Sequence, residues 1–208
     1  GLRSFPGLKN REEDYSEMIF NKFVKFCGVP VVSLESATRH PLQSLADLVT
    51  IQELKTRPRP KVVLTWAPHV KALPQAVPNS FAEWMCRAAV DFTITHPKGY
   101  ELSTEFTQGA TITHNQQEAL ADADFIYVKN WSAYEPYGQV FPGHKDWLLT
   151  NDSLKNTNNA KVMHCLPVRR NLELSDEILD GSHSVVIHEA GNRVWAAQAV
   201  LKQMLESL

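Results

Sequence analysis

Short apolar segments rich in β-branched and aromatic residues alternate along this chain with amphipathic helical patterns. The apolar segments are nearly continuous, which is typical of strands buried on both faces of a parallel sheet. The pattern therefore predicts a doubly wound, Rossmann-like α/β fold, with a mostly parallel sheet and helices on both faces. The predicted strands are Pro30–Leu34, Lys61–Trp66, Phe92–Thr95, Phe125–Lys129, Lys161–Cys165 and Ser184–Ile187.

Helical patterns occupy the intervals between these strands. The segment Pro41–Leu54 opens with a proline, which is favoured in a first helical turn, and its apolar residues recur at helical spacing. The segment Ser132–Leu154 has no clear periodicity and is expected to be a long functional or mobile loop. The other predicted helices are Tyr15–Phe26, Asn79–Val90, Asn115–Ala121, Ser175–Leu179 and Ala190–Leu208.

The charge and cysteine content narrow the possible partners and compartment. Lys and Arg number 21 against 23 Asp and Glu, and no basic run exceeds two residues, so we expect no nucleic-acid partner. No apolar stretch approaches the ~20 residues of a membrane span, so no membrane partner is expected. Three scattered cysteines without a C-x-x-C pair are typical of reduced thiols in a cytoplasmic protein.

Several common motifs are absent from the sequence. No two glycines stand two residues apart, which excludes G-x-G-x-x-G, and neither a P-loop nor a G-x-S-x-G elbow occurs. There is also no H-E-x-x-H motif and no paired-cysteine motif that would indicate zinc. We therefore expect neither a dinucleotide or other cofactor nor a metal.

Polar side chains follow the predicted strands at one edge of the sheet. Ligands of open α/β sheets bind outside the carboxyl ends of the strands. Taken singly, each of these residues would more often be a hydrogen-bonded loop residue or a solvated surface charge. Their convergence on one edge favours a binding site. The residues are Glu35, His40, His69, Lys129, Arg169 and Arg193.

The most informative local segment surrounds His40, which precedes the helix-opening Pro41. Gln43 lies one turn further on the same side of the predicted helix. A neutral histidine donor beside a glutamine amide can polarise a carbonyl group and hold an adjacent amino group. Both residues lie near a positive helix N-terminus, which suits an oxygen that gains negative charge.

Three motifs now identify a family resemblance. The segment Arg39–Asp47 reads R-H-P-L-Q-S-L-A-D and resembles the H-P-x-Q-x-L-A-D signature of aspartate and ornithine carbamoyltransferases. The segment His164–Pro167 matches the H-C-L-P signature of the ornithine-type branch. Glu189–Arg193 resembles the E-x-x-N-R element that precedes the last helix of the family. All three occur in the order and spacing of the family.

The substrate branch is suggested by a departure from the ornithine enzymes. Their D-x-x-x-S-M-G loop, which holds a free α-amino group, is replaced here by Y-V-K-N-W-S-A-Y at Tyr127–Tyr134. This replacement resembles the branch that acts on Nα-acylated ornithine. The segments Trp66–His69 and Leu73–Trp84 most resemble the sub-branch for N-succinylornithine, with N-acetylornithine and ornithine as alternatives.

The resemblance also implies an organisation. The family consists of two α/β domains assembled into a homotrimer with active sites shared between subunits, and its S-x-R-T phosphate loop is absent from this sequence. We expect residues 1–33 to be the end of a carbamoyl-phosphate domain and residues 34–189 to be the acylornithine-binding domain. Residues 190–208 are expected to form a terminal helix that packs back toward the first domain. The isolated chain is expected to be inactive and to expose an apolar patch.

In such an enzyme the δ-amine of the acylornithine attacks carbamoyl phosphate and phosphate leaves, as a step of arginine biosynthesis. Arg3, His40 and Arg193 are expected to polarise the carbamoyl carbonyl, while the backbone carbonyls of Cys165 and Leu166 accept from the two amino groups. The residues expected to act on carbamoyl phosphate or in catalysis are Arg3, His40, Gln43, Cys165, Leu166 and Arg193. The residues expected to hold the acylornithine are Glu35, His69, Lys129 and Arg169.

Charge gives weak support to the succinyl substrate. Its two carboxylates could meet three potentially cationic groups, those of His69, Lys129 and Arg169. Two functions of other classes remain open. One is a binding or assembly module without activity. The other is a hydrolase that uses Cys165 with His164. It ranks last because adjacent strand residues point to opposite faces and could not form the required pair unless the strand has ended.

Overall fold

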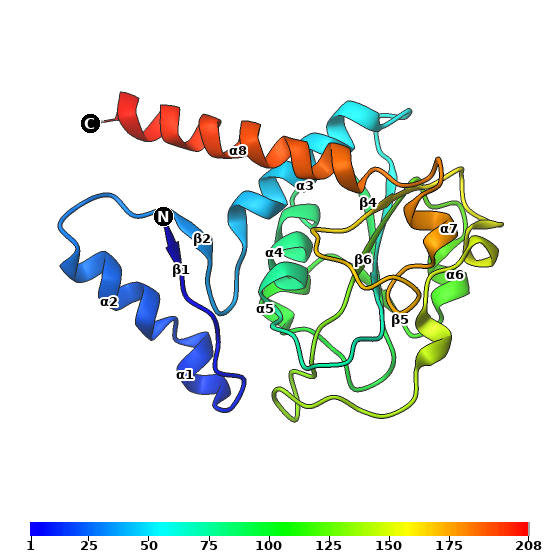
Figure 1. The fold of residues 1–208 in the computed structure, drawn as a ribbon, viewed down its shortest axis with the longest axis horizontal. Helices are drawn as coiled ribbons and strands as arrows, with labels where there is room; N and C mark the ends of the chain where they lie inside the picture. The colour runs from blue at the N-terminus through cyan, green and yellow to red at the C-terminus, as the bar shows by residue number, and fades with distance from the viewer. Residues whose placement is uncertain (208) are drawn as a thin grey trace.

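The structure, a computed structural model, describes residues 1–207. Its central sheet has five parallel strands in the order β5-β4-β3-β6-β7 (Figure 1). They are β3 (Lys61–Trp66), β4 (Asp91–Thr95), β5 (Thr111–Thr113), β6 (Phe125–Lys129) and β7 (Lys161–Met163). The central strand β3 pairs in register with both neighbours, since Val62 lies opposite Phe92 of β4 and opposite Phe125 of β6.

Helices cover both faces of this sheet, as the alternation of strand side chains requires. On one face, Val62 and Leu64 pack in a core with α3 (Pro41–Leu54) and α4 (Ala76–Met85). On the other face, Val63 packs in a second core with α6 (Gln116–Leu120) and α7 (Asp176–Leu179). The predicted doubly wound, parallel α/β fold is therefore confirmed. A short helix α5 (Thr104–Thr107) and two 3₁₀ turns, η1 (Lys145–Trp147) and η2 (Asn151–Leu154), complete the layers.

The first residues form a small unit beside the central sheet (Figure 1). Strand β1 (Leu2–Arg3) pairs in parallel with β2 (Ser33–Glu35), and α1 (Arg11–Tyr15) and α2 (Met18–Phe26) lie between them in the chain. The long helix α8 (Val186–Glu206) packs along α3 and then extends back past this unit (Figure 1).

Apolar side chains are exposed on α2 and α8, as the sequence predicts for a chain with an uncovered patch. Phe26 is 74% exposed and Trp195 is 65% exposed. No helix within residues 1–207 combines the length and apolarity that crossing a bilayer requires. The predicted division into units 1–33, 34–189 and 190–208 stays a prediction, although α8 begins at Val186, before the boundary expected for it, and Leu208 lies outside the described residues.

Several predicted elements need correction. The strands Lys61–Trp66 and Phe125–Lys129 are confirmed at their bounds, but Lys161–Cys165 ends at Met163 and Pro30–Leu34 is displaced to Ser33–Glu35. The strand predicted at Ser184–Ile187 is wrong, because only Ser184 forms a bridge, to Val162, before α8 begins. Its β-branched residues indicate a strand by propensity, and helix packing against α3 overrides that preference.

Candidate active site

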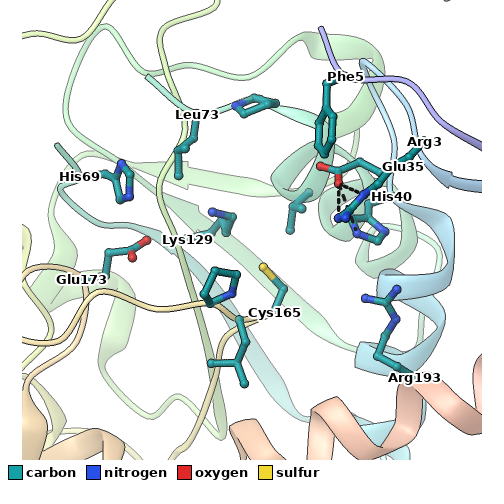
Figure 2. Close-up of a pocket in the computed structure, with 14 residues that line it drawn as sticks. Arg3, Phe5, Glu35, His40, His69, Leu73, Lys129, Cys165, Glu173 and Arg193 are labelled. Atoms are coloured by element: carbon teal, nitrogen blue, oxygen red, sulfur yellow. Dashed lines mark hydrogen bonds and ion pairs between the residues drawn. The ribbon is translucent and has the colours of Figure 1, made fainter. Parts of the chain in front are cut away.

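A cavity of about 320 Å³ lies at the carboxyl ends of β3, β6 and β7, beside the start of α3. Figure 2 shows Arg3, Glu35 and His40 grouped at one side, His69 and Glu173 at the other, and Lys129 and Cys165 between them. Of the ten predicted site residues, eight line this cavity. They are Arg3, Glu35, His40, His69, Lys129, Cys165, Leu166 and Arg193.

The β1–β2 pairing brings Arg3 opposite Glu35. Arg3 Nε and Nη2 donate to Glu35 Oε2 at 3.1 and 2.8 Å, so the carboxylate orients the guanidinium at the cavity wall. His40 Nε2 lies 3.7 Å from the same oxygen. The sequence analysis assigned Glu35 to the acylornithine, but in this structure its carboxylate binds Arg3.

His40 is 5% exposed and precedes the first residue of α3. Burial, together with the charges of Arg193 and Arg3, lowers the pKa of its imidazole to about 3. The ring is therefore neutral near pH 7 and keeps one N–H to donate. A neutral donor of this kind can polarise a carbonyl oxygen at the helix N-terminus, as the sequence predicts.

Gln43 lies behind the cavity rather than on its wall, where it is 1% exposed. Its Oε1 accepts a hydrogen bond from Arg193 Nη1. Its Nε2 donates to Asp47 Oδ1 at 2.7 Å and to Glu189 Oε1 at 3.2 Å. In this geometry Gln43 orients Arg193, which lines the cavity from α8.

The His164–Leu166 segment forms a turn directly after β7. His164 Nδ1 accepts from the backbone N–H of Leu166 at 2.9 Å, so its Nε2 carries the proton and lies 3.4 Å from Glu173 Oε1. Within residues 1–207, no hydrogen bond reaches the carbonyl oxygens of Cys165 and Leu166. These two carbonyls are therefore available to accept from an amino group, the role that the sequence predicts for them.

This turn also bears on the alternative of a cysteine hydrolase. The strand ends before His164, so the argument from opposite strand faces does not apply to these two residues. The His164 ring is nevertheless committed to Leu166 and Glu173, and burial raises the pKa of the Cys165 thiol to about 12. A thiol that stays protonated and lacks a free base is no nucleophile.

At the other wall, Arg169 Nε donates to His69 Nε2 at 3.0 Å. Arg169 does not line the cavity itself, but it contacts His69, which does. Because a guanidinium has only donors, His69 Nε2 must accept and carries no proton. Its Nδ1 lies 3.0 Å from both the carbonyl oxygen and the backbone N–H of Lys71. His69 is therefore neutral in this arrangement. Lys129, 8% exposed at the end of β6, is the buried cation of this wall.

Glu173 lines the cavity, and the sequence reasoning missed it. Its Oε2 accepts from the backbone N–H of Arg169 at 2.9 Å. Burial would raise the pKa of this carboxyl, but the hydrogen bond from His164 and the charges of His164 and Lys129 lower it overall. The signal that could have found it was its place in the loop after the predicted strand Lys161–Cys165, four residues beyond Arg169. The other lining residues that were not predicted form an apolar wall and are Phe5, Leu73, Pro74, Val77 and Pro167.

The sequence predicts no metal at this site. In the described part of the chain, one group could hold a metal ion, formed by His96, Glu101 and His114. None of these three residues lines the cavity.

The sequence was compared with protein families and with known relatives. Residues 74–204 match the model of the aspartate/ornithine carbamoyltransferase family, specifically its Asp/Orn-binding domain. Over its whole length the chain is 53% identical to an N-succinylornithine carbamoyltransferase from Bacteroides fragilis, of which it covers 66%. It is 33% identical to an N-acetylornithine carbamoyltransferase from Xylella fastidiosa, covering 97% of this chain and 66% of that relative.

Solved structures agree with this likeness. An N-acetyl-L-ornithine transcarbamylase mutant complexed with carbamyl phosphate and N-succinyl-L-norvaline superposes with a TM-score of 0.89 at 30% identity, covering 97% of this chain and 67% of that one. An acetylornithine transcarbamylase complexed with acetylcitrulline superposes with a TM-score of 0.90 at 29% identity, covering 97% and 66%. The chain thus spans about two thirds of the length of the relatives it matches.

Proposed function

Because this chain belongs to the aspartate/ornithine carbamoyltransferase family, we propose that it forms the acylornithine-binding part of an N-succinylornithine carbamoyltransferase. The enzyme would transfer the carbamoyl group of carbamoyl phosphate to the δ-amine of N-succinyl-L-ornithine and release N-succinyl-L-citrulline and phosphate. The observation that carries this proposal is the 53% identity to a relative of that name over the whole chain, against 33% for the N-acetylornithine relative.

The arrangement of the cavity supports this chemistry without a cofactor. The δ-amine attacks the carbonyl carbon, the C–O bond to phosphate breaks, and the phosphate leaves with that electron pair. Arg3 and Arg193 supply positive charge for the phosphoryl oxygens, and the neutral His40 donates to the carbonyl oxygen as it gains charge. The free carbonyls of Cys165 and Leu166 orient the two amino groups, so catalysis consists of positioning and electrostatics.

The acyl substrate is assigned to the wall formed by Lys129, His69 and Arg169. Since His69 is neutral, two cations remain there, and two cations suit the two carboxylates of succinylornithine. Glu35 belongs in this proposal to the orientation of Arg3 rather than to the acyl substrate. Gln43 belongs to the orientation of Arg193.

The proposal also covers the domain organisation, assembly, location and pathway of the enzyme. We assign residues 1–33 to the end of a carbamoyl-phosphate domain, residues 34–189 to the acylornithine domain, and residues 190–208 to a helix that returns to the first domain. The exposed apolar side chains of α2 and α8 support a covering partner for that region. A homotrimer with shared active sites, a cytoplasmic location and a role in arginine biosynthesis complete the proposal.

The test is an acceptor competition in the full-length protein. Carbamoyl phosphate is supplied with an equimolar mixture of ornithine, N-acetylornithine and N-succinylornithine, and the products are identified by mass spectrometry. We expect the succinylcitrulline to dominate. Dominance of acetylcitrulline or citrulline would reassign the acyl substrate, and the absence of every product would contradict the enzymatic function and favour a binding module.

A further inference from the structure

Two acidic side chains lie together behind the cavity, in the interface between α3 and α8. Asp47 and Glu189 are both 0% exposed, and the charge of Asp47 acts directly on Glu189. Gln43 Nε2 donates to both carboxyl groups, which keeps them side by side. Within the described residues, no lysine or arginine forms a salt bridge with either of them.

The positive charge that acts on this pair is that of Arg193. Arg193 faces it from α8 but is bonded to Gln43 rather than to a carboxylate. The hydroxyl of Tyr127 faces it from β6, and the thiol of Cys165 and the backbone N–H of His164 face it from the turn after β7. Two adjacent negative charges in such an interior are unfavourable, whereas one negative charge is balanced by Arg193.

The titration behaviour agrees with this charge balance. Burial raises the pKa of Asp47 to about 7, and the hydrogen bonds from Gln43 and Glu189 only partly oppose that rise. Burial and the neighbouring Asp47 raise the pKa of Glu189 well above its ordinary value. The two carboxyl groups therefore titrate as a unit.

The pair also contacts both sides of the site. Glu189 Oε2 accepts from the backbone N–H of His164 at 2.9 Å and so fixes the start of the turn that carries Cys165. Through Gln43, the pair is linked to Arg193 at the opposite side. Asp47 lies on the helix that begins directly after His40.

We propose that Asp47 and Glu189 share one proton and act as a positioning pair, which sets the location of Arg193 and of the Cys165–Leu166 turn. This rests on the proposed function only in that Arg193 and the turn are assigned there to carbamoyl phosphate. When the shared proton is lost, a second negative charge appears beside Gln43. This charge attracts Arg193 inward, away from the cavity, and so weakens the binding of the phosphoryl group by Arg193.

The shared proton can be observed without turnover. Infrared difference spectra of the protein, labelled with ¹³C-carboxyl aspartate or glutamate, distinguish a protonated carboxyl from a carboxylate. We expect a buried protonated carboxyl at neutral pH that disappears on the alkaline side, and that is absent from both Asp47→Asn and Glu189→Gln because an amide then supplies the donor. The matched control Glu177→Gln, at an exposed position on α7, should keep the signal.

A wild-type spectrum in which every carboxyl group is ionised at neutral pH overturns the proposal, and this result does not depend on whether a variant folds. A protonated carboxyl that survives in Asp47→Asn and in Glu189→Gln alike would also overturn it, because the proton would then reside elsewhere.

Kinetics of the full-length protein separate positioning from simple structural support. On the alkaline side, KM for carbamoyl phosphate should rise roughly tenfold in the wild type and much less in each single amide variant, because those variants have no second ionisation. The double variant Asp47→Asn/Glu189→Gln leaves Arg193 without its counter-charge and should raise this KM at every pH. If all variants lower kcat equally with an unchanged pH profile, the pair is merely structural. If the infrared signal is present but no acylornithine is carbamoylated, the proposed function fails and the shared proton stands.

Discussion

The 3.0 Å hydrogen bond from Arg169 Nε to His69 Nε2 joins two loops that are 100 residues apart in the chain. It requires a neutral His69, which removes one of the three cations that the sequence suggested for the acyl substrate. The guanidinium of Arg169 is oriented by this contact beside the cavity, while Lys129 supplies the other charge from the end of β6.

His69→Ala removes the acceptor that orients Arg169. We expect KM for N-succinylornithine to rise roughly tenfold, the effect of one lost charge-assisted hydrogen bond, with little change in KM for carbamoyl phosphate. Steady-state kinetics with each substrate varied in turn measure this. Lys71→Ala, an exposed side chain of the same loop, is the matched control and should behave as the wild type. A rise confined to carbamoyl phosphate would contradict the assignment of this wall.

Lys129→Ala should weaken acylornithine binding more strongly, because Lys129 is largely buried where it meets the cavity. A hydrogen bond to a charged group contributes about 1.5–3 kcal/mol, so we expect KM for the acylornithine to rise by ~10–100-fold. Isothermal titration with a non-reactive acylornithine analogue measures the same loss as an affinity. If only carbamoyl phosphate binding changes, the acyl substrate lies elsewhere.

His40→Ala should lower kcat by ~10²–10³-fold and raise KM far less, since a donor to the developing oxyanion acts mainly in the transition state. Because burial lowers the pKa of His40 to about 3, its donor form persists near neutral pH and should cause no acidic limb there. His188→Ala is the matched control. It removes an exposed histidine of α8 that bonds Glu53 outside the cavity, and its kcat should equal that of the wild type. An unchanged kcat in His40→Ala would remove His40 from the mechanism.

Asp47→Asn should change the pH dependence of stability. The pKa of Asp47 rises from 3.8 to about 7 on folding, so the folded chain binds the proton more tightly than the unfolded chain between about pH 4 and pH 7. The free energy of unfolding of the wild type therefore falls as the pH rises through this window, by up to ~4 kcal/mol for three pKa units. In Asp47→Asn the free energy of unfolding should change much less over the same pH window. Urea denaturation at several pH values measures it, and an equal fall in both proteins would contradict the assignment.

The sequence predicted the central strands well because they are buried on both faces and hence continuously apolar. β5 escaped prediction because Thr111–Thr113 is a short edge strand with two exposed residues. The strand predicted at Ser184–Ile187 was wrong because Val185, Val186 and Ile187 favour a strand locally, whereas the segment lies at the start of a helix that packs against α3.

The same limit applied to the site. The rule that ligands bind at strand ends located Lys129 and His69, because it depends only on topology. The rule does not predict contacts between segments that are distant in the sequence. Gln43 was expected to reach the substrate, but Arg193, 150 residues away, engages it behind the cavity. Glu173 and the Asp47–Glu189 pair depend likewise on how turns and helices pack, which no local pattern encodes.

The most direct test of the account is the initial rate of phosphate release from carbamoyl phosphate by the full-length protein, with ornithine, N-acetylornithine and N-succinylornithine in separate assays. We predict rapid release with N-succinylornithine and at least roughly tenfold lower kcat/KM with the other two, since each lacks one carboxylate for the wall of Lys129 and Arg169. Equal rates with all three acceptors, or no release with any of them, would contradict it.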